Sequence, residues 1–141
     1  MMPAIKPNQL PRVLLIEDER LLQIIHKRTL ELFGFEVIVV DHPQKAINLW
    51  TEHWDLILSD IGLPEIPGTD LCKLRRQYEE KYFLPRTPSF AYSAFGNTIQ
   101  DECLAAGFDG FGVKPMENSE LWDALQALLP KFKLIPFKKF S

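Results

Sequence analysis

Cysteine is scarce in this chain of 141 residues, which has only Cys72 and Cys103. Both lie in stretches of helical periodicity and neither belongs to a metal-binding or redox motif, so we expect two reduced thiols. Long apolar runs are also missing, since runs such as 13–16 and 37–40 are far shorter than the roughly 20 residues of a membrane helix. Residues 1–12 hold three prolines and no apolar core of a secretory signal. These absences predict a cytoplasmic protein without membrane insertion.

A large excess of one charge is absent as well, because 16 basic and 19 acidic residues give a net charge of −3. The charges are unevenly placed: residues 130–141 carry four lysines and no acid, so residues 1–129 carry −7. An acidic globular part argues against a nucleic-acid surface there. For the basic and aromatic tail we expect a solvated or back-packed segment, since four cations attract a membrane or nucleic acid only weakly.

What the chain does contain is an alternation of short β-branched runs with longer stretches of helical period. Strands are predicted at 13–16, 36–40, 56–58, 89–92 and 110–113, and helices at 19–33, 43–52, 69–81, 97–106 and 119–129. Gly34 and Gly107 suit helix ends, Pro43 suits a first turn, and Asn97 suits a cap. The pattern predicts an α/β, three-layer, doubly wound (flavodoxin-like) fold, with five helices around a parallel sheet of order 2-1-3-4-5. It fills one domain, 12–129, with an extension at 1–11 and the tail at 130–141.

Polar residues follow four of the predicted strands at their carboxyl ends. They are Glu17, Asp18 and Glu19 after the first strand, Asp60 after the third, Ser93 after the fourth and Lys114 after the fifth. Because ligands of such sheets bind at this edge, we expect these side chains to converge there. Facing carboxylates of Asp18 and Asp60 would repel each other without a cation, and Mg²⁺ suits a site of few carboxylates with room for phosphate oxygens. The set predicts a phosphoryl acceptor.

At these residues the sequence resembles a known family. The segments VLLIEDE (13–19), DLILSDIGLPEIPG (55–68), Ser93-Ala94 and Val113-Lys114-Pro115 are similar to the receiver domain of two-component response regulators. The resemblance covers about residues 12–129. Its spacings agree too, with 42 residues from Asp18 to Asp60, 33 from Asp60 to Ser93 and 21 from Ser93 to Lys114.

The resemblance implies a role for each of these residues. Asp60 would accept a phosphoryl group from a phosphohistidine, and Ser93 and Lys114 would contact the phosphoryl oxygens. Asp18 would bind Mg²⁺ directly, Glu17 through water, and the main-chain carbonyl of Gly62 would complete the protein ligands. The family also suggests a cis Lys114–Pro115 bond.

A conformational switch is also expected. The acylphosphate would draw the Ser93 hydroxyl inward, and the ring of Phe111 would fill the vacated space. Phe111 stands where the family often has tyrosine, and Glu17 where aspartate is commoner. Gly62 and Phe95 offer no polar group to a hydrolytic water, so we expect slow self-dephosphorylation and no conventional turnover enzyme.

The first helix carries more apolar residues than one buried stripe needs, namely Leu21, Leu22, Ile24 and Ile25. With Pro115 they predict a docking patch for a histidine kinase or a histidine phosphotransfer protein; the alternative is a fully packed helix. His26 is expected to be a structural histidine. Trp122 is expected to face outward as a partner or dimer contact, and the chain is expected to be a monomer or a weak phosphorylation-dependent dimer.

The sequence leaves several functions to be compared. The leading hypothesis is a receiver without its own output domain, and the closest alternative is a receiver fragment of a hybrid histidine kinase that relays phosphate. A phosphatase of the haloacid dehalogenase type would need an acid two residues after Asp60, where Gly62 stands. An unphosphorylated pseudo-receiver would not need Asp18, Asp60, Ser93 and Lys114 together.

Overall fold

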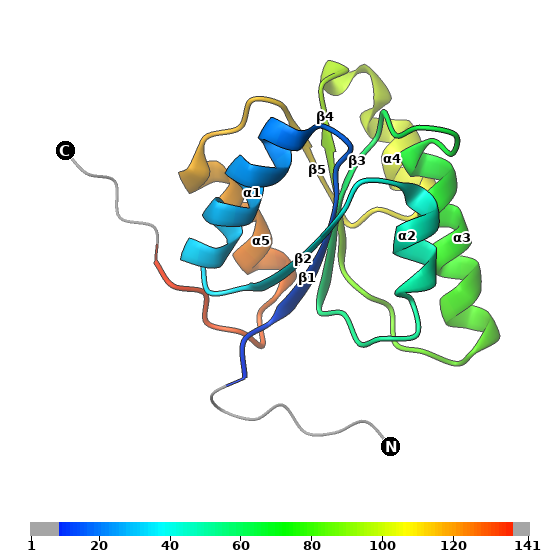
Figure 1. The fold of residues 1–141 in the computed structure, drawn as a ribbon, viewed down its shortest axis with the longest axis horizontal. Coiled ribbons are helices and arrows are strands. Elements are labelled where there is room, and N and C mark those ends of the chain that lie inside the picture. Colours follow the sequence, from blue (N-terminus) through cyan, green and yellow to red (C-terminus); the bar gives the residue numbers. More distant parts are fainter. Residues whose placement is uncertain (1–8, 137–141) are drawn as a thin grey trace.

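The computed structural model describes residues 9–136, which form a parallel sheet between two layers of helices (Figure 1). In chain order the elements are β1 (Arg12–Ile16), α1 (Arg20–Leu32), β2 (Glu36–Val40), α2 (Pro43–Asn48), β3 (Leu56–Asp60), α3 (Gly68–Lys81), β4 (Ser89–Ser93), the 3₁₀ helix η1 (Gly96–Ile99), α4 (Gln100–Ala106), β5 (Gly110–Val113) and α5 (Asn118–Leu128). The strand order is β2-β1-β3-β4-β5, so the predicted fold class and topology are confirmed.

The two faces of the sheet have separate apolar cores. On one face α1 and α5 pack over residues such as Leu15, Leu58 and Phe90, and on the other α2 and α3 pack over Leu14, Ile16 and Ile57. Because alternate residues of β1 and β3 enter opposite cores, these strands are buried on both sides. This burial explains why they appear in the sequence as unbroken apolar runs.

The glycines of β5 have a packing reason. A Cβ atom added to Gly110 would lie 2.7 Å from the Phe90 ring, and one added to Gly112 would lie 2.8 Å from Met116 Sδ. The Phe90 side chain of the neighbouring strand therefore occupies the space that side chains on β5 would need.

Helix ends were predicted less well than strands. The prediction that α2 reaches residue 52 is wrong: it ends at Asn48, because the amides of Leu49 and Trp50 bond to carbonyls three residues back and tighten the last turn. The capping role given to Asn97 is also wrong. Gly96, with φ +73°, is the first residue of η1, so Asn97 lies inside this helix and makes no capping hydrogen bond.

Other local predictions are confirmed. Pro43 lies in the first turn of α2, and Gly34 and Gly107 both take positive φ at helix ends. Both cysteines are buried free thiols. In the part of the chain that the structure describes, no helix is long and apolar enough to cross a membrane.

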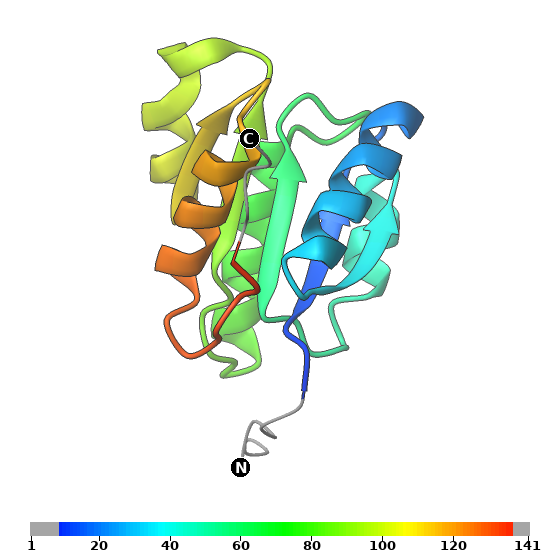
Figure 2. The same cartoon turned by 90° about the vertical axis from the view of Figure 1, so that its left-hand side faces the viewer.

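The start of the tail packs back on the domain between α1 and α5 (Figure 2). Leu134 is 2% exposed and joins the core under these helices, and the Ile135 amide donates to the Phe33 carbonyl. Trp122 does not extend freely outward as expected, because its indole Nε1 donates to the Ile135 carbonyl. Lys138 and Lys139 lie outside the described residues.

Candidate phosphoryl and metal site

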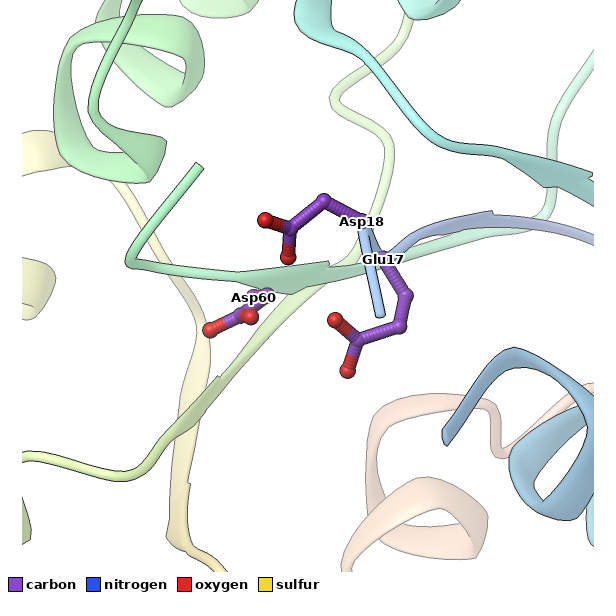
Figure 3. A group of neighbouring side chains, drawn as sticks. All are labelled: Glu17, Asp18 and Asp60. Atoms are coloured by element: carbon purple, nitrogen blue, oxygen red, sulfur yellow. The ribbon is translucent and has the colours of Figure 1, made fainter. Parts of the chain in front are cut away.

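Three acidic residues gather where β1 and β3 end (Figure 3). Glu17 and Asp18 follow β1, Asp60 is the last residue of β3, and one oxygen from each lies within 4.8 Å of the others. Glu17 is buried, Asp60 is half-buried and Asp18 is exposed. Carboxylate oxygens at this spacing are the hard donors that Mg²⁺ prefers, and exposure on the Asp18 side leaves room for the waters that Mg²⁺ keeps. The residues present therefore fit a magnesium ion.

The carboxylate of Asp60 is held in one orientation by the start of the next loop. Its Oδ1 accepts hydrogen bonds from the amides of Ile61 at 2.7 Å and Gly62 at 3.3 Å. Its Oδ2 lies 3.3 Å from Lys114 Nζ. Both oxygens thus face positive partners, while the residue remains open to the edge of the sheet.

Lys114 bridges two of the acids. Its Nζ lies 2.8 Å from Glu17 Oε1 and 3.3 Å from Asp60 Oδ2. Burial lowers the pKa of this amine, but the two carboxylates together raise it by a larger amount. The pKa of Lys114 therefore lies above its ordinary value. Lys114 is therefore a fixed cation at neutral pH.

Glu17 is the most enclosed of the acids, since it is only 1% exposed. Its Oε2 accepts from the Glu19 amide at 3.2 Å, and its main-chain carbonyl accepts from Gln23 Nε2 at 2.6 Å. Burial raises the pKa of Glu17 to about 7, against the attraction of Lys114. A cation at this site would favour the ionised form.

The predicted switch residues, Ser93 and Phe111, lie on the neighbouring strands β4 and β5. Ser93 is fully buried, and its Oγ accepts from the Phe95 amide at 2.9 Å, which leaves its O–H proton available to donate. Phe111 is half-buried and packs against the cluster of Ala91, Cys103 and Phe108. No hydrogen bond of the described residues joins Ser93 to Asp60.

Gly62 and Phe95 are the two residues without a polar side chain from which slow dephosphorylation is predicted, and they lie next to each other. A Cβ atom on Gly62 would lie 3.3 Å from Phe95 Cε2, so the aromatic ring lies over the glycine. The Phe95 side chain is 59% exposed. It forms an apolar cover beside the phosphoacceptor position.

The first turns of α1 expose most of the predicted docking patch. Leu21, Ile24 and Ile25 are 62%, 56% and 48% exposed, Leu22 is half-buried and Pro115 is exposed. The alternative of a fully packed helix is therefore wrong for three of the four patch residues on α1. The Lys114–Pro115 peptide bond is cis.

The fold and the site agree with what comparison with known proteins shows. The model of the response regulator receiver domain matches residues 13–126 of this chain. The chain belongs to this family. Family membership removes the haloacid dehalogenase alternative, whereas the choice between a stand-alone receiver and a receiver of a larger protein stays open.

Two curated relatives match this chain over part of their own length. The chain is 33% identical over 125 residues to the phosphate regulon transcriptional regulatory protein PhoB of Rhizobium meliloti, covering 88% of this chain and 54% of PhoB. It is 30% identical over 115 residues to the virulence sensor protein BvgS of Bordetella pertussis, covering 79% of this chain and 9% of BvgS. The chain thus spans about half of the transcriptional regulator and a small part of the sensor.

Solved receiver structures superpose over most of the chain. The chemotaxis protein CheY4 of Vibrio cholerae gives a TM-score of 0.76 at 25% identity, covering 86% of this chain and 100% of CheY4. The receiver domain of the sensor histidine kinase PA1611 of Pseudomonas aeruginosa, which holds a magnesium ion in its active site cleft, gives 0.75 at 26%, covering 86% and 99%.

Two residues of the site escaped sequence reasoning. Gln23 holds the Glu17 carbonyl from α1, and Tyr92 lies beside Lys114 with its hydroxyl on the Met116 amide. Tyr92 directly precedes Ser93 at a strand end, which was the available signal. Its partner is a backbone amide 24 residues away, which a sequence pattern does not show.

Proposed function

We propose that this receiver domain accepts a phosphoryl group on Asp60 from a phosphohistidine, in a reaction that requires Mg²⁺. The observation that carries the proposal is the contact of one lysine, Lys114, with both Glu17 and Asp60 within a cluster of three carboxylates. A cation and a group of metal-binding oxygens close to one carboxylate are what transfer of a phosphoryl group requires.

The reaction needs no separate base, because Asp60 is the nucleophile in its ionised form. A carboxylate oxygen of Asp60 forms a bond to phosphorus, and the bond from phosphorus to the histidine nitrogen breaks with its electron pair left on nitrogen. The amides of Ile61 and Gly62 fix the orientation of the carboxylate, and Lys114 neutralises charge on the transferred oxygens. Mg²⁺ bound by Glu17, Asp18, Asp60 and the Gly62 carbonyl would supply further positive charge there.

The signal would leave through a change of packing. The available O–H proton of Ser93 can donate to a phosphoryl oxygen, which would release the Phe95 amide or draw the loop after β4 inward. Phe111, on the neighbouring strand, would then repack toward the space beside Ser93. Phosphorylation would in this way change the surface formed by η1, α4 and β5.

The phosphorylated state should be long-lived. A hydrolytic water needs a polar group to orient it, and the two positions beside Asp60 are taken by Gly62 and the Phe95 ring that covers it. The receiver would act as a carrier of signal rather than as a turnover enzyme.

The partner would be a helical histidine kinase or histidine phosphotransfer domain. The exposed side chains of Leu21, Ile24 and Ile25 on α1 lie next to the acidic site, because α1 begins three residues after Glu17. Relatives support two settings, a regulator such as PhoB and a sensor such as BvgS. In the second setting the domain would pass phosphate on to a phosphotransfer protein.

Intact mass measurement tests the proposal directly. The protein is incubated with a small acylphosphate donor, with Mg²⁺ or with EDTA in excess. We expect the wild type to gain one phosphoryl group only with Mg²⁺, Asp60→Asn to gain none, and Asp70→Asn, an exposed control on α3, to behave as wild type. Absence of a gain in the wild type, or an equal gain in Asp60→Asn, would overturn the proposal.

A further inference from the structure

We infer that Tyr92 is a positioning residue that fixes the Lys114 ammonium against the site; this rests on the proposed function of Lys114. Tyr92 lies on β4, where its Cα pairs with Asp60 of β3 on one side and with Gly112 of β5 on the other. It therefore lies between the phosphoacceptor strand β3 and the strand β5, which Lys114 directly follows.

The backbone around Lys114 is tied to two consecutive residues of β4. The Lys114 amide donates to the Ser93 carbonyl at 2.7 Å, and the Met116 amide donates to the Tyr92 hydroxyl at 2.9 Å. Pro115 between them has no N–H to donate. The Tyr92 hydroxyl therefore accepts the first backbone hydrogen bond after that of Lys114. Without it, this part of the loop would be bonded to β4 only through the Lys114 amide.

The ring of Tyr92 also contacts the charged end of Lys114. Nζ lies 5.5 Å from the ring centroid, within the range of a cation–π attraction. The His26 ring of α1 packs on Tyr92 at a centroid distance of 5.0 Å, and burial lowers the pKa of His26 to about 4. His26 is therefore neutral at pH 7 and adds no repulsion next to Lys114.

Burial of Tyr92 keeps its hydroxyl in the neutral form that accepts the Met116 hydrogen bond. Tyr92 is 5% exposed, and burial raises the pKa of its hydroxyl, so the phenol stays uncharged beside Glu17 and Lys114. A phenylalanine would keep the ring and its packing but would leave the Met116 amide without its acceptor. Loss of one such hydrogen bond changes an equilibrium by about fivefold.

The test compares two ligands in wild type and Tyr92→Phe. Mg²⁺ alone reports the carboxylates, and beryllofluoride, a tetrahedral mimic of a bound phosphoryl group, reports Lys114 as well. We expect Tyr92→Phe to bind Mg²⁺ within twofold of wild type, and to bind beryllofluoride at saturating Mg²⁺ about fivefold more weakly. Tyr78→Phe makes the same chemical change on α3, away from the site, and should alter neither affinity.

The outcomes separate this inference from the proposed function. If wild type binds no beryllofluoride and accepts no phosphoryl group, both fall. If wild type binds it and Tyr92→Phe binds it equally, or loses Mg²⁺ affinity by the same factor, only the positioning role is overturned. Amide hydrogen exchange in the wild type gives a check that needs no variant: slow exchange is expected at Met116, and exchange as fast as in an exposed loop would contradict the anchor.

Discussion

At the scale of single residues, two buried ionisable side chains beside Lys114 have pKa values shifted in opposite directions. Burial raises the pKa of Glu17 to about 7, and burial lowers the pKa of His26 to about 4. Both groups therefore favour their neutral forms in the folded protein. The charges of Lys114 and Asp60 act on both groups, with smaller effects than burial.

These shifts predict opposing effects of pH on stability. Between pH 4.5 and 7 the folded chain holds a proton on Glu17 that the unfolded chain has lost, so this term of the stability falls as pH rises. Between pH 4 and 6.5 the unfolded chain holds a proton on His26 that the folded chain lacks, so that term rises with pH. In the wild type the two terms nearly cancel.

Variants that lack one of the two groups should show the contribution of the other to the free energy of unfolding. The measurement is urea unfolding without Mg²⁺ from pH 4.5 to 6.5. Relative to wild type, the stability of His26→Phe should fall with rising pH, and that of Glu17→Gln should rise, each by up to about 1.4 kcal/mol per pH unit. Parallel pH profiles for the three proteins would contradict the opposing shifts.

The apolar cover over Gly62 leads to a second prediction for a single residue. Phe95→Gln would replace the covering ring by an amide that can orient water, so the lifetime of the phosphorylated protein should shorten several-fold. Phe83→Gln, at a fully exposed aromatic on the loop after α3, is the matched control. Phosphoryl lifetimes measured by intact mass after removal of the donor decide the matter, and an unchanged lifetime in Phe95→Gln would count against the cover.

At the scale of elements, α3 is fastened to the start of β4 by a buried ionic network. Glu79 accepts hydrogen bonds from Arg75 Nε at 2.9 Å, Arg76 Nη1 at 2.8 Å and the Thr87 amide at 2.9 Å. Burial alone would raise the pKa of Glu79, but the hydrogen bonds from Thr87, Arg76 and Arg75 lower it by more. The pKa of Glu79 therefore lies below its ordinary value. Both Arg75 and Glu79 are 5% exposed.

Removing one partner of this network should be costly. Glu79→Ala leaves the Arg75 charge buried without its carboxylate, so the free energy of unfolding should fall by about 3–5 kcal/mol. Glu80→Ala removes the same group from the exposed next residue and should change stability by less than about 0.5 kcal/mol. Equal effects of the two substitutions in urea unfolding would refute the ionic anchor.

The elements also show what the sequence could predict. Strands were placed closely because both faces of β1 and β3 are buried, which gives short runs of consecutive apolar residues. The positions of Asp18, Asp60 and Lys114 followed from strand ends. The end of α2, the role of Tyr92 and the network of Glu79 did not, because each depends on partners distant in sequence or on a local choice between hydrogen-bond patterns.

At the scale of the whole molecule, the domain core extends past the region that the family model matches. Leu134 lies eight residues beyond residue 126 and is nevertheless 2% exposed under α1 and α5. Leu134→Ala should therefore lower the free energy of unfolding by about 2–5 kcal/mol. Ile135→Ala, at a side chain 55% exposed, should cost far less, and comparable losses in the two variants would mean that the tail adds no core.

The docking of Leu134 and Ile135 also places this part of the tail at one end of the strands. Ile135 is bound to Phe33 at the end of α1, next to the start of β2, so the tail lies at the edge of the sheet opposite Asp60. A strand of five residues separates the two edges by about 17 Å. Residues 134–136 therefore lie away from the phosphoryl site, and phosphorylation of Asp60 would reach them through the sheet and its helices.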